Sequence, residues 1–513
     1  MFNIANMPEM FAARNTTQPA LIDPVSGVTR TYGALADRTD RLAGALFDEL
    51  GVGRGGRIAA LSRNSIELVE LYIATARVGA MLFPLNWRFS ATQVAEALLD
   101  AAPDVVFYEA EFADVVAEIR TRVDTVWVEW STGKDSAYEE LLVRVQPRIA
   151  EVRRRLPDSK SLLFEPYLAI STGGTSGIPK SAVHSQYSYG ACTIDYLAAT
   201  RVAEDDTYLM LGQLFHVVGY MAFAYLLRGR PVVVANFQSD GMLELIRQER
   251  VSAFMAIGAM LPRLVAEAEK DGNPPTTVRI LEYGGAPMGA DTIRKAGELF
   301  KADLMQTWGM TEFGPGTYLG PDAHRRALSG EKPELFRSCG DSALLSTLAV
   351  LDLETGRPVP RDGKTMGELC HRGPNNMIGY WNKPEETAGL VRGGWIHTGD
   401  GVTWDEEGFC YIVDRLKSMI ISGGENIFPS EVERCLGDHP EITEAAVIGA
   451  PDEEWGEVVK AFVVRAPGSS LTEDEVGRYV GENLASYKKP RVVEFKDALP
   501  MTPTGKVNRK LLK

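Results

Sequence analysis

The chain lacks an excess of positive charge: 54 lysine and arginine residues stand against 69 aspartate and glutamate residues, a formal net charge of −15 at pH 7. Proteins bind nucleic acids and anionic membranes through clusters of lysine and arginine. The charge balance therefore argues against a broad surface for either of them. A local cationic site for a nucleotide is still compatible with it.

Cysteines and long apolar runs are also scarce. The five cysteines, at positions 192, 339, 370, 410 and 435, form no CxxC pair and show no metal-ligand spacing, so we interpret them as reduced thiols in a protein core. The longest apolar stretch, residues 217–227, is too short to span a bilayer, and the N-terminus has no basic segment followed by a long apolar run. We expect a soluble, cytoplasmic protein without integral membrane association.

Helical and strand patterns alternate along most of the 513 residues. A helical pattern opens at Tyr32 and another covers residues 65–80, while buried strands are expected at 57–61, 103–107, 207–211, 231–234 and 278–281. This alternation predicts stacked βαβ units. After about residue 338 short strands and turns follow, and from residue 418 helices and strands alternate again.

We therefore predict an α/β fold with two domains. A large N-terminal domain, residues 1–416, has stacked βαβ subdomains and a small β-rich subdomain over about 338–416, and a small mobile α+β C-terminal domain covers residues 417–513. The polar residues 131–160 indicate a solvated excursion with one helix, in which residues 153–155, three arginines, form a surface face rather than a binding patch. Ser430 is expected to cap a helix that starts near residue 429.

The most informative segment is residues 171–180, STGGTSGIPK, with three glycines, four hydroxyl residues and one lysine. Glycines let backbone N–H groups approach anionic oxygens, while hydroxyls and lysine add donors and charge. The segment follows a predicted strand at 167–170, and strand ends bind ligands in α/β proteins. A Ser/Gly linker fits the composition about equally well, but a Walker A loop does not, because Pro179 stands where that loop has glycine.

Seven further motifs follow in order: Phe215-His216, YGGAP at 283–287, QTWGMTE at 306–312, HTGD at 397–400, DRLK at 414–417, SGGEN at 422–426 and PTGK at 503–506. Together with the loop they closely resemble the adenylate-forming superfamily, which contains acyl-CoA synthetases, coumarate-CoA ligases, luciferases and peptide-synthetase adenylation domains. The resemblance extends from about Tyr32 to the end of the chain. One such motif is a weak signal, but eight in order are a strong one.

The resemblance implies that a carboxylate attacks the α-phosphate of ATP, which gives acyl-AMP and pyrophosphate. The phosphates are then assigned to the loop residues Thr172, Gly173, Gly174, Thr175, Ser176 and Lys180. Thr311 would contact the α-phosphate, and Glu312 would ligate Mg²⁺, a hard cation that prefers oxygen ligands. Trp308, followed by Gly309 and Met310, would stack on adenine, and the opposite wall would consist of Gly284, Gly285, Ala286 and Pro287.

The remaining motifs imply contacts to the sugar and to the second substrate. Asp400 and Arg415 would bind the ribose, and Lys506 would reach between the substrate carboxylate and the α-phosphate, where its charge offsets their repulsion. Lys417 matches a hinge about which the C-terminal domain turns between adenylation and thioester formation. The pantetheine arm of CoA would then pass along Ser422, Gly423, Gly424 and Glu425.

His216 has two interpretations: a contact or gate near the substrate carboxylate and CoA tunnel, or a buried structural histidine. The expected acyl pocket consists of His216, Val217, Gly219, Tyr220, Gly258, Ala259, Gly284, Met310 and Phe313. These residues are apolar and several are small, which favours a medium-chain, alicyclic, aromatic or polycyclic acid over acetate. Residues 211–216 contain no aspartate for a substrate ammonium, so an amino acid is disfavoured.

Two positions depart from the family pattern, which has serine at Gly173 and glycine at Ser181. Weaker ATP binding or slower adenylation is expected from them. Two alternatives to a carboxylate-CoA ligase therefore stay open: an acyl-AMP ligase that loads a carrier protein, and a nucleotide-binding regulatory protein of the same fold with little turnover. The expected cofactors are ATP, Mg²⁺ and CoA, and the expected partners are small molecules, not nucleic acid; a homodimer is compatible with the sequence.

Overall fold

The computed structural model describes residues 3–13, 16–146, 149–172, 180–286, 288–501 and 507–512. Its contacts divide the chain into two compact units, one formed by Met1–Thr347 and Arg372–Ile396 and the other by Leu348–His371 and His397–Lys513. The expected domain boundary after residue 416 stays a prediction. In the described part of the chain no helix is long and apolar enough to cross a lipid bilayer.

Two large sheets form the framework of the first unit. The strands of one sheet are β1 (Pro19–Asp23), β2 (Val28–Thr31), β9 (Tyr208–Met210), β10 (Val232–Val234), β11 (Ala253–Ile257), β12 (Ile280–Gly284), β13 (Asp303–Met310), β14 (Gly314–Leu319) and β15 (Asp341–Ser342), in the order β15-β14-β13-β12-β11-β9-β10-β1-β2. The strands of the other are β3 (Arg57–Leu61), β4 (Met81–Leu85), β5 (Val105–Glu109), β6 (Val126–Trp130), β7 (Pro166–Ser171), β8 (Ser181–Ser185) and β18 (Gly379–Tyr380), in the order β18-β8-β7-β4-β3-β5-β6. The central strands of both sheets are parallel, so the predicted α/β class is confirmed.

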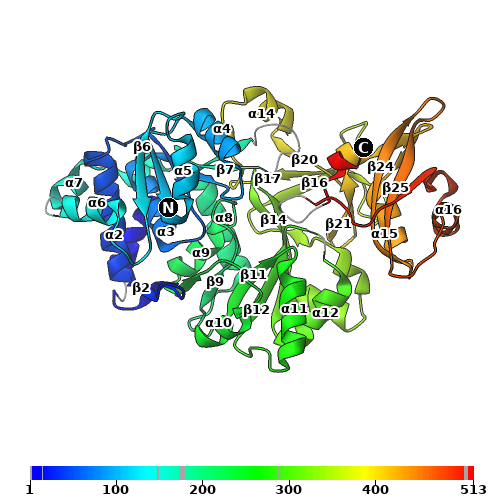
Figure 1. The fold of residues 1–513 in the computed structure, drawn as a ribbon, viewed down its shortest axis with the longest axis horizontal. Coiled ribbons are helices and arrows are strands. Elements are labelled where there is room, and N and C mark those ends of the chain that lie inside the picture. The colour runs from blue at the N-terminus through cyan, green and yellow to red at the C-terminus, as the bar shows by residue number, and fades with distance from the viewer. Residues whose placement is uncertain are drawn as a thin grey trace. The chain divides into compact units, whose positions relative to one another are not determined.

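The helices of the first unit cover both faces of these sheets. They are α1 (Met7–Ala12), α2 (Tyr32–Asp48), α3 (Ile66–Val78), α4 (Ala91–Ala101), α5 (Ala113–Ile119), α6 (Ala137–Val145), α7 (Ile149–Arg155), α8 (Gln186–Thr200), α9 (Gly219–Leu227), α10 (Met242–Gln248), α11 (Met260–Asp271), α12 (Ala290–Phe300), α13 (Pro321–Leu328) and α14 (Pro384–Leu390). Helices α11 and α12 lie beside β11 and β12 (Figure 1).

Alternation along the strands produces three apolar layers. In β3, Ala59 and Leu61 belong to a core with α4 and α5, whereas Ile58 and Ala60 join the central core that contains α2, α3, α8 and α9. In β12, Leu281 faces a third core with α10, α11 and α12. The two sheets therefore share one central layer of helices, and each has a second layer on its other face.

Residues 131–160 are not the solvated excursion that their polarity predicts. They contain two helices, α6 and α7, and the side chain of Tyr138 is fully buried in the central core. The helices pack on α2, where Arg153 pairs with Asp40 at 2.5 Å and Arg155 with Asp48 at 2.9 Å. The prediction was wrong because a narrow apolar stripe at helical spacing is enough to anchor an otherwise charged segment.

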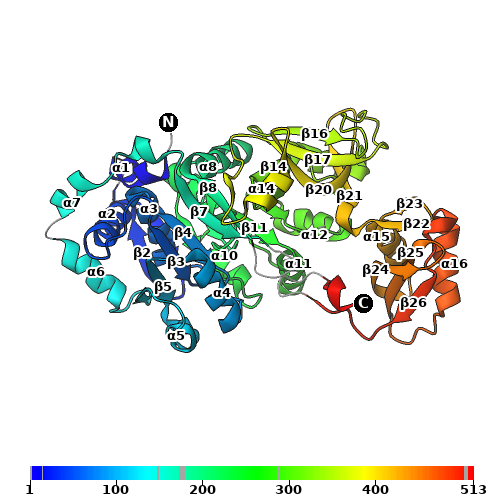
Figure 2. The same cartoon turned by 90° about the horizontal axis from the view of Figure 1, so that it is seen from above.

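The second unit contains two smaller sheets. The first has β16 (Thr347–Leu351), β17 (Gly367–Arg372), β20 (Trp395–Trp404) and β21 (Cys410–Arg415), and its fifth strand, β19 (Val391–Arg392), belongs to the first unit together with the residues of β20 that it pairs with. The second sheet has β22 (Ile420–Ser422), β23 (Glu425–Ile427), β24 (Ile442–Asp452), β25 (Gly456–Arg465) and β26 (Val492–Phe495). Helices α15 (Pro429–Gly437) and α16 (Glu473–Asn483) pack on the second sheet (Figure 2). The second sheet and its two helices form the α+β arrangement that the sequence predicts for the C-terminal domain.

The start of α15 differs from the expectation. Ser430 lies inside the helix, and its hydroxyl donates to the carbonyl of Val413 at 2.5 Å. Phe428 occupies the N-cap position without a side-chain hydrogen bond, and Pro429 is the first helical residue. The N–H of Ser430, the second helical residue, donates to Oδ2 of Asp414 at 2.7 Å, so a carboxylate of β21 satisfies the donor that a capping side chain usually satisfies.

Candidate active site

The carboxyl ends of four parallel strands place the predicted substrate loops at one edge of the larger sheet. Strand β9 leads to residues 211–216, β11 to Gly258 and Ala259, β12 to Gly285 and Ala286, and β13 to Thr311 and Glu312. The loops are in contact: a Cβ atom added to Gly285 would lie 3.2 Å from Cγ2 of Ile257. Residues from three of the motifs, together with the expected acyl-pocket residues Gly258 and Ala259, therefore share one edge, where α/β sheets bind ligands.

Glycine is required where the predicted adenine wall meets β13. Gly284 pairs with Thr307, and a Cβ atom at Gly284 would collide with the Thr307 carbonyl oxygen. Trp308 is partly exposed, and its ring lies 5.8 Å from that of Phe313, centroid to centroid. The flat face that the sequence assigns to adenine is thus positioned by packing against Phe313.

The phosphate loop joins two antiparallel strands. Ser171 of β7 pairs with Ser181 of β8, and the N–H of Thr172 donates to the carbonyl of Lys180 at 2.7 Å. Residues 173–179 of the loop lie outside the described residues, as do Pro287 and Lys506. The loop is therefore held at its base as a hairpin between Thr172 and Lys180.

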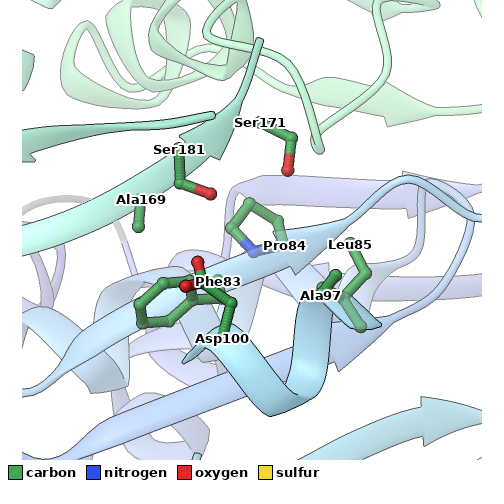
Figure 3. A pocket seen from close by; sticks show the side chains of 8 residues that line it. All are labelled: Phe83, Pro84, Leu85, Ala97, Asp100, Ala169, Ser171 and Ser181. Atoms are coloured by element: carbon green, nitrogen blue, oxygen red, sulfur yellow. The ribbon is translucent and has the colours of Figure 1, made fainter. Parts of the chain in front are cut away.

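Ser181, one of the two departures, faces a small pocket below the hairpin. Figure 3 shows the hydroxyls of Ser181 and Ser171 directed toward Pro84, with the Asp100 carboxylate beside Phe83. The room for solvent is about 10 Å³, which is no more than one water molecule needs. The pocket is too small for an acyl group or a nucleotide.

Glu312 and Lys180 are brought together by Tyr380, which no sequence signal pointed to. The Tyr380 hydroxyl donates to Oε1 of Glu312 at 2.5 Å, and the Lys180 Nζ atom lies 5.1 Å from the centroid of the Tyr380 ring. Burial, together with the Glu312 charge, raises the pKa of Tyr380, so the phenol stays protonated as a donor. The cation of the phosphate loop and the predicted metal ligand thus share one aromatic side chain.

The backbone of Thr311 is held by a second residue that sequence reasoning missed. The Nε2 atom of His184 lies 2.7 Å from the Thr311 carbonyl oxygen, so this nitrogen carries the proton and donates. Burial lowers the pKa of His184 to about 4, against an opposing effect of this hydrogen bond. A neutral imidazole therefore fixes Thr311 at neutral pH.

A buried asparagine holds the loop that carries His216. The Asn64 amide donates to the carbonyls of Gly212 and Ala235, both at 3.1 Å, and its Oδ1 accepts from the N–H of Leu214 at 2.9 Å. The rings of Phe215 and His216 lie 4.4 Å apart, and His216 is half-buried. His216 is thus presented at the strand edge, rather than enclosed in a core.

In the second unit the structure joins the two predicted ribose contacts. Asp400 of β20 pairs with Arg415 of β21, and Nε of Arg415 lies 2.7 Å from Oδ1 of Asp400. The Arg415 guanidinium also donates to the carbonyl of Thr398 at 3.2 Å. The Asp400 side chain is 3% exposed and that of Arg415 is 49% exposed. The buried carboxylate therefore holds an arginine whose side chain is open to solvent.

The segment predicted for CoA is a tight hairpin. Ser422 of β22 pairs with Glu425 of β23, and Gly423 and Gly424 form the turn with φ values of +59° and +87°. The Trp455 ring packs directly on Gly423, whereas nothing lies within 4 Å of a Cβ atom at Gly424. Lys417 is the middle residue of a short 3-10 turn, Leu416–Ser418, which directly follows β21.

Comparisons with known proteins identify relatives along the whole chain. The family model for AMP-binding enzymes matches residues 9–381, and that for the AMP-binding enzyme C-terminal domain matches residues 431–506. A feruloyl-CoA synthase from Amycolatopsis sp is 35% identical over 485 residues, which cover 94% of this chain and 93% of that protein.

A second relative and a solved structure also match along nearly the whole chain. The fatty acid-[acyl-carrier-protein] ligase ScoC from Streptomyces coeruleorubidus is 32% identical over 511 residues, which cover 98% of this chain and 94% of that protein. The crystal structure of ATP-bound MatB from Rhodopseudomonas palustris has a TM-score of 0.86 and 26% identity, and the match covers 100% of this chain and 98% of that one.

Proposed function

This chain belongs to the family of AMP-binding enzymes and is an AMP-forming acyl-CoA synthetase, and from that premise we propose that it joins a medium-chain, alicyclic, aromatic or polycyclic carboxylic acid to CoA. The main support is the shared edge of β9, β11, β12 and β13. In this sheet the loops that the sequence assigns to adenine, α-phosphate and acid follow strands that are parallel neighbours.

The reaction has two balanced steps. A carboxylate oxygen of the acid attacks the α-phosphorus of ATP, the bond from that phosphorus to the bridging oxygen breaks, and pyrophosphate leaves. The thiol sulfur of CoA then attacks the carbonyl carbon of the acyl-AMP, the thiol proton is released, and AMP leaves with the mixed-anhydride oxygen. Both steps place negative charge on phosphate oxygens, and preorganised cations and donors stabilise such charge.

The chain's own residues have separate tasks in this scheme. Lys180 supplies positive charge at the phosphate loop, and Asp400 with Arg415 holds the ribose. Lys506, which lies outside the described residues, is proposed to offset the repulsion between carboxylate and α-phosphate. Glu312 suits Mg²⁺ because its carboxylate is buried and held by Tyr380, and Mg²⁺ commonly combines one carboxylate with phosphate oxygens. When bound, Mg²⁺ supplies further positive charge to the phosphates.

The proposed acid follows from the apolar side chains at the same edge. Val217, Met310 and Ile257 are each half-buried, and nothing lies within 4 Å of a Cβ atom added to the loop glycine Gly258. Each buried CH₂ group favours binding by about 0.8 kcal/mol until the space is filled. The feruloyl-CoA synthase relative, whose name specifies an aromatic acid, is in line with this class.

A carrier protein is the second candidate acceptor. The relative ScoC is named as a fatty acid-[acyl-carrier-protein] ligase, and a carrier presents the same pantetheine end as CoA. Nothing lies within 4 Å of a Cβ atom added to Gly424, which is compatible with either acceptor.

The test is a panel of acetate, octanoate, benzoate, ferulate and a polycyclic acid with ATP and Mg²⁺. The acceptor is either CoA or a carrier protein that has its phosphopantetheine arm attached and its thiol free. We expect acid-dependent pyrophosphate release and an acyl-CoA product by mass, with acetate the poorest acid. Acyl transfer to the carrier alone would favour the second candidate. A preference for acetate would reject the proposed acid class.

A further inference from the structure

Three potential metal ligands converge in the second unit, on two strands that are neighbours in the sheet order. Glu368 and Cys370 are alternate residues of β17 and so face the same side, and His397 is on β20. Their ligand atoms lie within 4.8 Å of one another; among the described residues this is the one group of at least three such side chains. Cys370 is buried, while Glu368 and His397 are 13% and 17% exposed, so the group is reached from solvent on one side.

The spacing of the group fits a tetrahedral zinc ion. Zn–S and Zn–N bonds of about 2.3 and 2.0 Å put a coordinated sulfur and nitrogen roughly 3.5 Å apart. The Sγ atom of Cys370 lies 3.5 Å from Nδ1 of His397. Nδ1 of His397 lies 2.7 Å from Oε2 of Glu368 because the two atoms share a hydrogen bond. A metal ion that displaces this proton requires the two atoms to move apart to roughly 3.3 Å.

The carboxylate is already oriented for such a role. Oε1 of Glu368 accepts from the N–H of Gly399 at 3.0 Å, while Oε2 faces His397. Hydrogen bonds to the second atom of a ligand group commonly fix metal ligands in place. One thiolate, one imidazole and one carboxylate form a set that Zn²⁺ takes and that Mg²⁺ and Ca²⁺ do not prefer.

We propose that Glu368, Cys370 and His397 form a binding site for Zn²⁺, separate from the proposed Mg²⁺ ligand Glu312. Solvent supplies the fourth ligand on the exposed side. Binding releases the thiol proton of Cys370 and the Nδ1 proton of His397.

The site is connected to the proposed ribose contact Asp400 through strand β20, which contains His397, Thr398 and Asp400. His397 is followed by Thr398, whose hydroxyl donates to the Leu369 carbonyl at 2.6 Å and accepts from the N–H of Asp400 at 3.1 Å. Opening the Glu368-His397 pair therefore displaces the segment that positions Asp400. We expect bound Zn²⁺ to raise the KM for ATP, an effect that rests on the proposed function of Asp400.

Metal binding is measured on the purified full chain without any substrate. After dialysis against Zn²⁺ in excess Mg²⁺, we expect one zinc per chain, and with Co²⁺ a thiolate-to-cobalt charge-transfer absorption. Cys370→Ala should abolish the absorption and weaken zinc binding roughly 100-fold or more. Glu368→Gln should also weaken binding, although its amide oxygen can still accept from Gly399. Cys410→Ala, a buried cysteine of β21 outside the group, is the matched control and should bind normally.

Zinc binding by Cys370→Ala as tight as by the parent, or no zinc on the parent chain, would overturn the site. For the coupling, Zn²⁺ should raise the KM for ATP several-fold in the parent and in Cys410→Ala but not in Cys370→Ala. An equal rise in all three would place the inhibitory zinc elsewhere. Because the metal count is independent of turnover, these results stand apart from any failure of the proposed acid specificity.

Discussion

The hydroxyl of Tyr380 donates a 2.5 Å hydrogen bond to Oε1 of Glu312, although 68 residues separate them in the sequence. The contact is possible because Tyr380 lies on β18, which pairs with β8, and the N–H of Met377 donates to the Glu312 carbonyl at 2.7 Å. The contact fixes one oxygen of the buried carboxylate that we propose as the Mg²⁺ ligand.

Tyr380→Phe should slow adenylation by roughly 10- to 150-fold, since a hydrogen bond to a charged group contributes about 1.5–3 kcal/mol. The apparent Mg²⁺ requirement should rise, because the Glu312 carboxylate loses its orientation. Pyrophosphate release over a Mg²⁺ series measures both effects. Tyr187→Phe, whose ring packs on Phe164, is the control, and an unchanged Mg²⁺ dependence in Tyr380→Phe would contradict the role assigned to this contact.

Asp400→Asn should raise the KM for ATP about tenfold or more and reduce discrimination against 2′-deoxy-ATP. In the proposed arrangement the carboxylate of the parent protein accepts hydrogen bonds from the ribose hydroxyls. Removing the 2′-hydroxyl should therefore weaken nucleotide binding only while this carboxylate is present. The four combinations of enzyme and nucleotide form a double-mutant cycle. Additive losses would show that Asp400 supports Arg415 without touching the sugar.

Glu282→Gln should stabilise the protein increasingly as the pH rises. Burial raises the pKa of Glu282 to about 8 from 4.5, so between these values the folded state keeps a proton that the unfolded state has lost. Stability from this group is complete below pH 4.5 and declines as the pH rises toward 8. Between pH 5.5 and 8.5 the advantage of the glutamine variant in unfolding free energy should grow by roughly 3 kcal/mol. A pH-independent difference in denaturant melts would mean that Glu282 is ionised in the fold.

Gly284→Ala should destabilise the first unit by roughly 2 kcal/mol or more, because the new Cβ atom collides with the Thr307 carbonyl between paired strands. Gly289→Ala is the matched control, since nothing lies within 4 Å of a Cβ atom there. Thermal unfolding of both variants decides the matter. Similar melting temperatures would show that β12 and β13 can separate without cost.

Lys506→Ala should reduce acyl-AMP formation by roughly 10²–10³ but spare CoA attack on presynthesised acyl-AMP. The lysine is proposed to act only where carboxylate and α-phosphate repel each other. Single-turnover measurements of each half-reaction separate the two steps. Acyl-AMP formation at the parent rate would remove Lys506 from the mechanism.

Local patterns in the sequence determined the α/β class and the position of many elements. The strand at 57–61 and the helix that opens at Tyr32 agree with β3 and α2, because apolar periodicity and the N-capping Thr31 act over a few residues. The order of eight motifs likewise indicated the family to which the chain belongs. The polarity of residues 131–160 gave a wrong prediction because a narrow apolar stripe, which includes Tyr138, is enough to bury one face of the segment.

The tertiary structure alone decided which distant side chains meet. Neither the Tyr380 contact to Glu312 nor the group of Glu368, Cys370 and His397 follows from spacing, since each depends on which strands pair and in which register. His184 and Asn64 were missed for the same reason, because each contacts backbone more than a hundred residues away. A local pattern specifies which face of a strand is apolar, but the partner of each residue is set by the packing of the whole sheet.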